Sequence, residues 1–396
     1  MNGNITELSA KLASVTVFKN IIESEVIKSL NAFLVCAGNK VEKTKLYSAF
    51  VGSLYAHDCD LGKYIKKHLY EDENEYVIRV SQKQAIPDCM QKAVQAELNI
   101  FSELSSIEPK ELADLTGFDG YLPVFENTAF DFETEYREKL NRLFKDGYGI
   151  YSKYSMFNIK NDGEITPLKS ADQITVDDLV GYEAEREKVI ANTRALVNGK
   201  PAANILLCGD AGTGKSSTVK AVANMFAKDG VRLIEIQKEQ LMCLPIIMEE
   251  IHHNPLKFII FIDDLSFNKT EDGFGTLKAI LEGSASAKAN NAVIYATSNR
   301  RHLVKESFSD RDGDDIHRAD TIQELLSLSE RFGLTIQYSK PSKDLYLKIV
   351  KSLAQKKELA ISENELCMKA EAFALRKGGR SARAAKQFVD SLVAIG

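Results

Sequence analysis

Residues 209–216 have the spacing of a phosphate-binding loop, G-x-x-x-x-G-K-[ST], and are the part of the chain best suited to chemistry. The glycines allow successive N–H groups to turn toward an anion, and a helix that begins near Lys215 presents its positive end to the same place. Lys215 suits the β- and γ-phosphates, and the Ser216 hydroxyl suits Mg²⁺. A chance glycine-rich turn would lack the buried strand that the apolar residues 205–208 predict just before the loop. The loop therefore predicts that a nucleoside triphosphate is bound by Gly209, Asp210, Ala211, Gly212, Thr213, Gly214, Lys215, Ser216 and Ser217.

Two carboxylates, Asp263 and Asp264, follow a second apolar run, at residues 258–262. At the C-terminal end of such a strand, Asp263 can hold Mg²⁺ beside the triphosphate. The adjacent Asp264 can orient or polarise the attacking water. Apolar strands that end in aspartate are common, and the pattern alone is weak. It carries weight here because it follows a phosphate-binding loop.

Asn299 and Arg331 are candidates for contact with the γ-phosphate. Asn299 ends the buried strand predicted for residues 292–299, where its amide can hydrogen-bond the phosphate or the water; the alternative is an ordinary turn residue. Arg331 lies just before the last predicted strand, and its rigid, permanently charged guanidinium suits a γ-phosphate. The alternative for Arg331 is a surface ion pair with Glu330 or Glu324.

Further positive charge lies in the basic C-terminal segment, at Arg380 and Arg383. On a helix, a spacing of three positions places both side chains on one face. Either arginine could reach the phosphates of a nucleotide bound in a neighbouring domain. The alternative is a solvated basic face.

The elements expected to position these residues are parallel strands that alternate with helices. Apolar runs predict five strands, at residues 205–208, 231–236, 258–264, 292–299 and 334–338. This alternation predicts an α/β domain in which helices cover both faces of a parallel sheet. The first 150 residues are mostly helical and show no catalytic constellation, and the glycine-containing segment 147–169 predicts a connector. From residue 341 onward only helical patterns remain.

The composition is that of an ordinary globular protein. The chain has 396 residues, of which 44% are hydrophobic and 27% charged, with a formal net charge of −5. This charge argues against a surface that coats nucleic acid, so nucleic acid remains a possible partner without support from the sequence. The six cysteines show no disulfide or metal-site spacing, the N-terminus does not resemble a signal peptide, and no apolar run is long enough to cross a membrane. We therefore expect a cytoplasmic protein without membrane contact.

Taken in order, the phosphate-binding loop, the Asp-Asp strand, the Thr-Ser-Asn strand, the Arg-Phe-Gly segment and the terminal arginine helix resemble an AAA+ ATPase. Over residues 170–396 the chain more narrowly resembles a bacterial family of predicted AAA+ ATPases described as a domain of unknown function. The segments that carry the narrower resemblance are Asp178-Leu-Val-Gly-Tyr182, Asn192-Thr193, Ser266-Phe267, Ala296-Thr-Ser-Asn-Arg-Arg-His-Leu303, Ser327-Leu-Ser-Glu-Arg-Phe-Gly333 and Gly379-Arg-Ser-Ala-Arg383.

The resemblance implies that residues 209–216 form the Walker A motif and that Asp263 and Asp264 form Walker B. The second Walker B position is usually a glutamate. Asp264 is one methylene shorter, which puts its strength as a catalytic base in doubt.

The resemblance also implies roles for the remaining polar candidates. Asn299 corresponds to sensor 1, Arg331 to the arginine finger, and Arg383, in preference to Arg380, to sensor 2. An arginine finger acts on the ATP of an adjacent subunit, so the resemblance implies a homo-oligomer.

These features predict three domains: a mostly helical N-terminal domain at 1–165, an αβα nucleotide-binding domain with a five-stranded parallel sheet at 166–339, and a helical lid at 340–396. The predicted reaction is hydrolysis of ATP to ADP with Mg²⁺, coupled to movement of the lid and remodelling of an unidentified macromolecular partner. One alternative is a nucleotide-gated switch with slow turnover, which the short Asp264 favours. Another is a P-loop kinase or small-molecule phosphotransferase, against which the sensor and finger residues and the helical lid argue.

Overall fold

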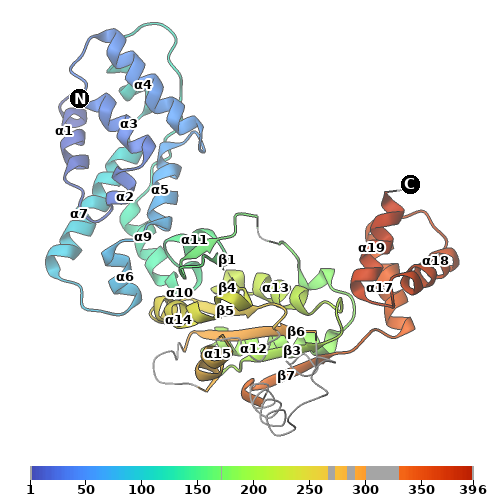
Figure 1. Ribbon diagram of the computed structural model, residues 1–396. Coiled ribbons are helices and arrows are strands. Elements are labelled where there is room, and N and C mark those ends of the chain that lie inside the picture. The colour runs from blue at the N-terminus through green and yellow to red at the C-terminus, as the bar shows by residue number, and fades with distance from the viewer. Residues whose placement is uncertain (1, 171, 266–272, 283–289, 300–329, 395–396) are drawn as a thin grey trace. The chain divides into compact units, whose positions relative to one another are not determined.

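The computed structural model describes residues 2–170, 172–265, 273–282, 290–299 and 330–394. The chain divides into two compact units, Met1–Lys153 and Tyr154–Gly396 (Figure 1). Three of the segments that carry the family resemblance therefore lie outside the described residues in whole or in part, at 266–267, 300–303 and 327–329.

The first unit is built from helices, as the sequence predicted. Its core is formed by aliphatic and aromatic side chains, in which the ring of Phe18 packs edge-on against Phe101 and Tyr136. The helices are α1 (Asn2–Ala13), α2 (Lys19–Ile22), α3 (Glu25–Leu34), α4 (Lys40–Tyr55), α5 (Leu61–Glu71), α6 (Glu75–Ser81), α7 (Asp88–Ser105), α8 (Pro109–Asp114), α9 (Phe132–Asn141), α10 (Leu143–Asp146) and α11 (Ile150–Lys153).

The second unit is organised around one sheet of seven strands in the order β2-β1-β4-β5-β6-β3-β7. All neighbouring strands are parallel except β1 and β2, which are antiparallel. The strands are β1 (Met156–Ile159), β2 (Ile165–Pro167), β3 (Ile205–Gly209), β4 (Val231–Ile236), β5 (Lys257–Ile262), β6 (Ala292–Ser298) and β7 (Leu334–Tyr338).

The five parallel strands predicted from the sequence are confirmed as β3 to β7. The expectation of a five-stranded sheet was wrong because β1 and β2 extend it beside β4. They lie in the segment that the sequence indicated as a connector. With four and three residues, separated by a polar turn, they are too short to show a hydrophobic period.

Helices cover both faces of this sheet, since burial is unbroken along β3. α12 and α13 share one core with alternate residues of β3 to β7, and the strand residues that point the other way, such as Leu206 and Ile260, are also buried, with α14 packed against β6. The described helical elements between β2 and β7 are η1 (Val176–Asp178), α12 (Glu183–Val197), α13 (Lys215–Met225), η2 (Ala227–Asp229), η3 (Lys238–Cys243), α14 (Leu244–His252) and α15 (Gly273–Leu281).

The C-terminal lid consists of α17 (Lys343–Lys356), α18 (Glu363–Arg376) and α19 (Ala382–Val393) around a separate small core. A serine caps the start of each helix by accepting a hydrogen bond from a backbone amide of the first turn. The α/β fold with a helical N-terminal region and a helical lid is thus confirmed. The lid helices have a core of their own, and the second compact unit begins at Tyr154, so it includes β1 and β2 of the sheet.

In the first unit, the buried carboxylate of Asp60 joins the start of α5 to a distant loop. It accepts hydrogen bonds from the amides of Lys63 (3.1 Å) and Thr128 (3.0 Å), and from the Thr128 hydroxyl (2.6 Å). Burial by itself raises the pKa of this carboxyl, but the hydrogen bonds outweigh burial and hold the pKa at about 2.

We predict that Asp60→Asn removes on the order of 2 kcal/mol of stability from the first unit at pH 7. The pKa of Asp60 in the folded chain lies below its ordinary value of 3.8, so its contribution is complete above about pH 4 and is lost as the pH falls through about 2. Urea unfolding of the full chain at several pH values, with hydrogen exchange of α5 to assign the transition, measures both effects. An equally steep loss of stability below pH 4 in Asp60→Asn would contradict this assignment.

Candidate functional site

The phosphate-binding loop connects the end of β3 to the start of α13, at the edge where the parallel strands end. Two of its glycines are required by close contacts. Gly209 has φ +134°, and a Cβ there would lie 1.9 Å from the carbonyl oxygen of Tyr338. Gly212 has φ +75°, and a Cβ there would lie 3.2 Å from the Cβ of Arg383. The loop is therefore packed between the end of β7 and the start of α19.

The ammonium of Lys215 is buried beneath this loop. Its Nζ donates hydrogen bonds to the carbonyl oxygens of Gly209 (2.9 Å) and Asp210 (2.8 Å), and to the Oδ1 atom of Asn299 (3.1 Å). Burial lowers the pKa of Lys215, and the negative charge of Asp210 opposes that shift. The lysine predicted to bind phosphate is thus held in place by oxygen acceptors that a phosphate can replace.

Two hydrogen bonds bring the other predicted residues to the same point. Ser216 Oγ donates to Asp263 Oδ1 (2.6 Å), and Asn299 Nδ2 donates to Asp264 Oδ1 (2.7 Å). Together with Lys215, these five side chains come from α13, from the turn after β5 and from the end of β6. The structure therefore brings the predicted serine, both carboxylates and the amide into one cluster.

Asp264 has an unusual backbone conformation, with φ +51°. Residues other than glycine seldom adopt the left-handed region, which costs roughly 1–2 kcal/mol, although aspartate tolerates it better than most. The backbone turn exposes the Asp264 side chain toward the pocket, whereas Asp263 stays half-buried.

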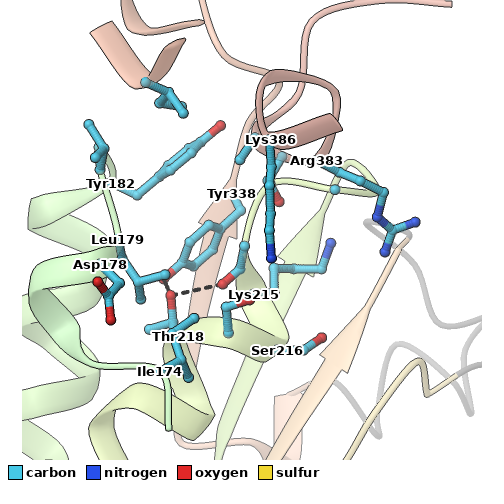
Figure 2. Close-up of a pocket in the computed structure, with 18 of the residues that line it drawn as sticks. Ile174, Asp178, Leu179, Tyr182, Lys215, Ser216, Thr218, Tyr338, Arg383 and Lys386 are labelled. Atoms are coloured by element: carbon cyan, nitrogen blue, oxygen red, sulfur yellow. Dashed lines mark hydrogen bonds between the residues drawn. The ribbon is translucent and has the colours of Figure 1, made fainter. Parts of the chain in front are cut away.

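A pocket of about 950 Å³ opens over this cluster. Its volume is within the range that holds a nucleotide-sized ligand. Figure 2 shows Lys215 and Ser216 on one side and Ile174, Leu179 and Tyr182 on the other. Of the predicted loop residues, 211–217 line the pocket, whereas Gly209 and Asp210 act through the hydrogen bonds of their carbonyl oxygens to Lys215.

Sequence reasoning missed the apolar end of this pocket. The ring of Tyr182 lies 5.1 Å from that of Tyr338, whose hydroxyl donates to Thr218 Oγ1 (3.2 Å). The segment 178–182 could have indicated this apolar end, but the sequence analysis used it only for the family resemblance and gave its residues no role in binding. The apolar side chains that line this end are Ile174, Leu179, Val180, Tyr182, Tyr338, Ile349 and Leu353.

The lid lines the pocket with Arg383 and Lys386 of α19, labelled in Figure 2, and with Lys356 and Lys357 at the end of α17. The backbone amide of Arg383 also donates to the carbonyl oxygen of Gly212 (3.2 Å), so α19 begins directly against the loop. Arg380 does not line the pocket; it forms a two-pronged ion pair with Glu371 (2.9 and 2.6 Å) inside the lid. Lys386 was missed, although its spacing of three from Arg383 places it on the same helix face.

Ion pairs connect α17 of the lid to the segment that precedes and opens α12. Lys356 Nζ lies 3.0 Å from Asp178 Oδ1, and Lys348 Nζ lies 3.0 Å from Glu183 Oε1. Hydrogen bonds from Thr175, reinforced by Lys356, hold the pKa of Asp178 at about 2. These side chains are partly exposed, so each pair contributes little energy by itself.

Arg331 lies away from the pocket. It precedes β7, whereas the phosphate-binding loop lies where the parallel strands end. Its Nη2 atom lies 3.1 Å from Glu282 Oε1, and its side chain is 42% exposed. The alternative from the sequence was a surface ion pair with Glu330 or Glu324. The structure pairs Arg331 with Glu282, and Glu324 lies outside the described residues.

The donor set suits Mg²⁺ bound together with a triphosphate. The hydroxyl of Ser216 and the carboxylate of Asp263 are oxygen ligands of the kind that Mg²⁺ prefers, and they already lie within 2.6 Å of each other. Within the described ranges, no group of three or more His, Cys, Asp or Glu side chains is placed to hold a metal ion. None of the helices in the described part of the chain is long and apolar enough to span a membrane.

Comparison with protein families identifies the family of this chain. The family described as "Protein of unknown function (DUF815)" matches residues 152–395. The chain belongs to the DUF815 family. The match confirms the family resemblance drawn from the motifs, and it covers the whole of the pocket described above.

Solved structures similar to this DUF815 chain include two of RuvB from Thermotoga maritima. A RuvB mutant is 13% identical with a TM-score of 0.36, over 55% of this chain and 73% of that one. The RuvB Holliday junction branch migration motor is 14% identical with a TM-score of 0.33, over 55% of this chain and 72% of that one. No curated protein matches the chain.

We predict that Arg383→Ala weakens ATP binding by roughly 10- to 100-fold, because it removes one charge-assisted hydrogen bond to the nucleotide. Arg380→Ala is the matched control, because it removes an arginine of the same segment that pairs with Glu371. It should leave ATP affinity near that of the unmodified chain. Isothermal titration calorimetry measures both, and the opposite ranking would assign the phosphate contact to Arg380.

Proposed function

We propose that this DUF815 chain is an AAA+ type ATPase, which hydrolyses ATP with Mg²⁺ and couples the reaction to movement of its lid and remodelling of a macromolecular partner. The observation that carries the proposal is the hydrogen-bonded cluster formed by Lys215, Ser216, Asp263, Asp264 and Asn299. In it, a cation, a metal-binding hydroxyl and carboxylate, a second carboxylate and an amide meet beside a pocket of nucleotide size.

Each residue of the cluster has a distinct part in the proposed reaction. The amides of the loop and Lys215 neutralise and position the phosphates, while Ser216 and Asp263 would hold Mg²⁺. Mg²⁺ in that place supplies positive charge to the phosphate oxygens during transfer. Asp264 accepts a proton from the attacking water, and Asn299 holds Asp264 in place and can hydrogen-bond the water or the γ-phosphate.

A slow-turnover switch is the second candidate, and one observation favours it. The short side chain of Asp264 is already engaged by Asn299 in a 2.7 Å hydrogen bond. This bond occupies one carboxylate oxygen and leaves the other to accept the proton, on a side chain one methylene shorter than the usual glutamate. ATP binding would then set the position of the lid without rapid hydrolysis.

We further propose that the active form is a homo-oligomer. Arg331 is exposed beside the edge strand β7, at the start of the strand and away from its own phosphate-binding loop. A guanidinium there can approach the ATP of a neighbouring subunit once it leaves Glu282. The site would then be completed only between two chains.

We predict that Lys215→Ala weakens ATP binding at least about 100-fold, because it removes the buried charge that faces the phosphates. Asp264→Asn is the matched control: it keeps that charge and should bind ATP normally while releasing phosphate more slowly. Calorimetry measures the binding and a phosphate-release assay the turnover. Unchanged ATP affinity in Lys215→Ala would overturn the proposed function, and wild-type turnover in Asp264→Asn would assign the base elsewhere.

We predict that a mixture of Arg331→Ala and Lys215→Ala chains regains part of the activity that each lacks. The first keeps a working loop and the second a working arginine, and an arginine supplied in trans is typically worth about 10³–10⁵ in rate. Phosphate release is measured for each variant alone, for the mixture, and for the wild type at several dilutions. No recovery on mixing, together with activity that does not depend on dilution, would place Arg331 outside the reaction and favour a monomeric switch.

A further inference from the structure

Thr297, near the end of β6, lies beside the two carboxylates of the turn that follows β5. The register of the parallel pair places Ile262 opposite Ala296, so the next residues, Asp263 and Thr297, come side by side. Thr297 is 2% exposed and lines the pocket. The sequence analysis used this threonine only as part of a motif and assigned no role to it.

Three hydrogen bonds join Thr297 to three successive residues of the turn. Its hydroxyl donates to Asp263 Oδ1 (2.5 Å) and accepts from the backbone amide of Asp264 (3.0 Å). Its carbonyl oxygen accepts from the amide of Leu265 (2.7 Å). A single residue of β6 therefore holds both the side chain of Asp263 and the backbone of Asp264.

The hydroxyl bond determines which oxygen of Asp263 is engaged. Among the described residues, the Thr297 hydroxyl, the Ser216 hydroxyl (2.6 Å) and the Asp264 amide (3.1 Å) all donate to Oδ1. With three donors on one oxygen, the carboxylate cannot rotate freely, and its other oxygen is left for a further ligand. The same hydroxyl holds the amide of Asp264 while that residue is in its left-handed conformation.

This arrangement requires a group that donates and accepts at the same time. A hydroxyl has one proton and two lone pairs, so threonine and serine can make both bonds, whereas valine has the shape of threonine and can make neither. The hydroxyl, rather than the volume of the side chain, is therefore the element that orients the turn.

We propose that Thr297 is a positioning residue, which orients Asp263 toward Mg²⁺ and holds Asp264 in the backbone conformation that turns its carboxylate into the pocket. The inference rests on the proposed function, since it assigns Mg²⁺ to Ser216 and Asp263. Thr297 acts through these two carboxylates and needs no contact of its own with the nucleotide.

The test compares Thr297→Val and Thr297→Ser with the wild type. ATP affinity is measured by calorimetry in EDTA and in Mg²⁺, and phosphate release is measured as a function of Mg²⁺ concentration. Loss of a partner that orients a metal ligand typically costs about 10- to 100-fold in metal affinity or activity. Thr297→Val should lose that much of the gain in ATP affinity that Mg²⁺ provides and require correspondingly more Mg²⁺ for half-maximal turnover, while its affinity in EDTA stays unchanged.

Thr297→Ser should restore both Mg²⁺-dependent quantities, because the hydroxyl is kept and only a methyl group is lost. The proposal is overturned if Thr297→Val keeps the wild-type Mg²⁺ response, or if Thr297→Ser is impaired as much as Thr297→Val, which would show that packing matters and the hydroxyl does not. If the wild type itself neither binds nor hydrolyses ATP, the proposed function fails, and this outcome is read from the wild type alone.

Discussion

The arrangement of the site in the second unit depends on the hydrogen bonds that replace the hydration of the buried Lys215 ammonium. A cation removed from water is costly unless hydrogen bonds replace its hydration. Here the replacements are two carbonyl oxygens of the phosphate-binding loop and the amide oxygen of Asn299. The ammonium therefore sets the spacing between the loop and the end of β6. Since phosphate oxygens are charged, they are stronger acceptors than these neutral groups, and the negative charge of a triphosphate would oppose the lowering of the Lys215 pKa that burial causes.

The lid is attached to the nucleotide-binding core by weak contacts on both sides of the pocket. On one side α17 forms the pairs Lys356–Asp178 and Lys348–Glu183, and on the other the amide of Arg383 reaches Gly212. Each contact is partly exposed and contributes little on its own. Val180 also packs against the lid core. A ligand that contacts both loop and lid would add to these contacts and favour the lid position in which it makes both.

Much of the site could be predicted because it depends on short local patterns. The loop, the strand that ends in Asp263-Asp264 and the Thr-Ser-Asn strand are each contiguous, and parallel strands bring their ends to one edge of a sheet. The rest depends on strand register or on distant segments. The role of Thr297 requires the pairing of β5 with β6, and the partner of Arg331 is Glu282, which no nearby pattern indicated. The strands β1 and β2 were missed because each is too short to show a period.

The connection from β7 to the lid has a mechanical consequence. Asp210 of the loop donates its amide to Tyr338 (3.2 Å), and its carboxylate accepts from the amide of Lys340 (3.0 Å), just before α17 begins. The segment that leads from β7 to the lid is thus hydrogen-bonded to the loop that is expected to hold the phosphates. Under the proposed function, a pull applied to the lid would reach that loop through these two hydrogen bonds and would alter the time for which a nucleotide stays bound. Because linked equilibria are reciprocal, the position of the lid would affect nucleotide affinity as much as a bound nucleotide affects the position of the lid.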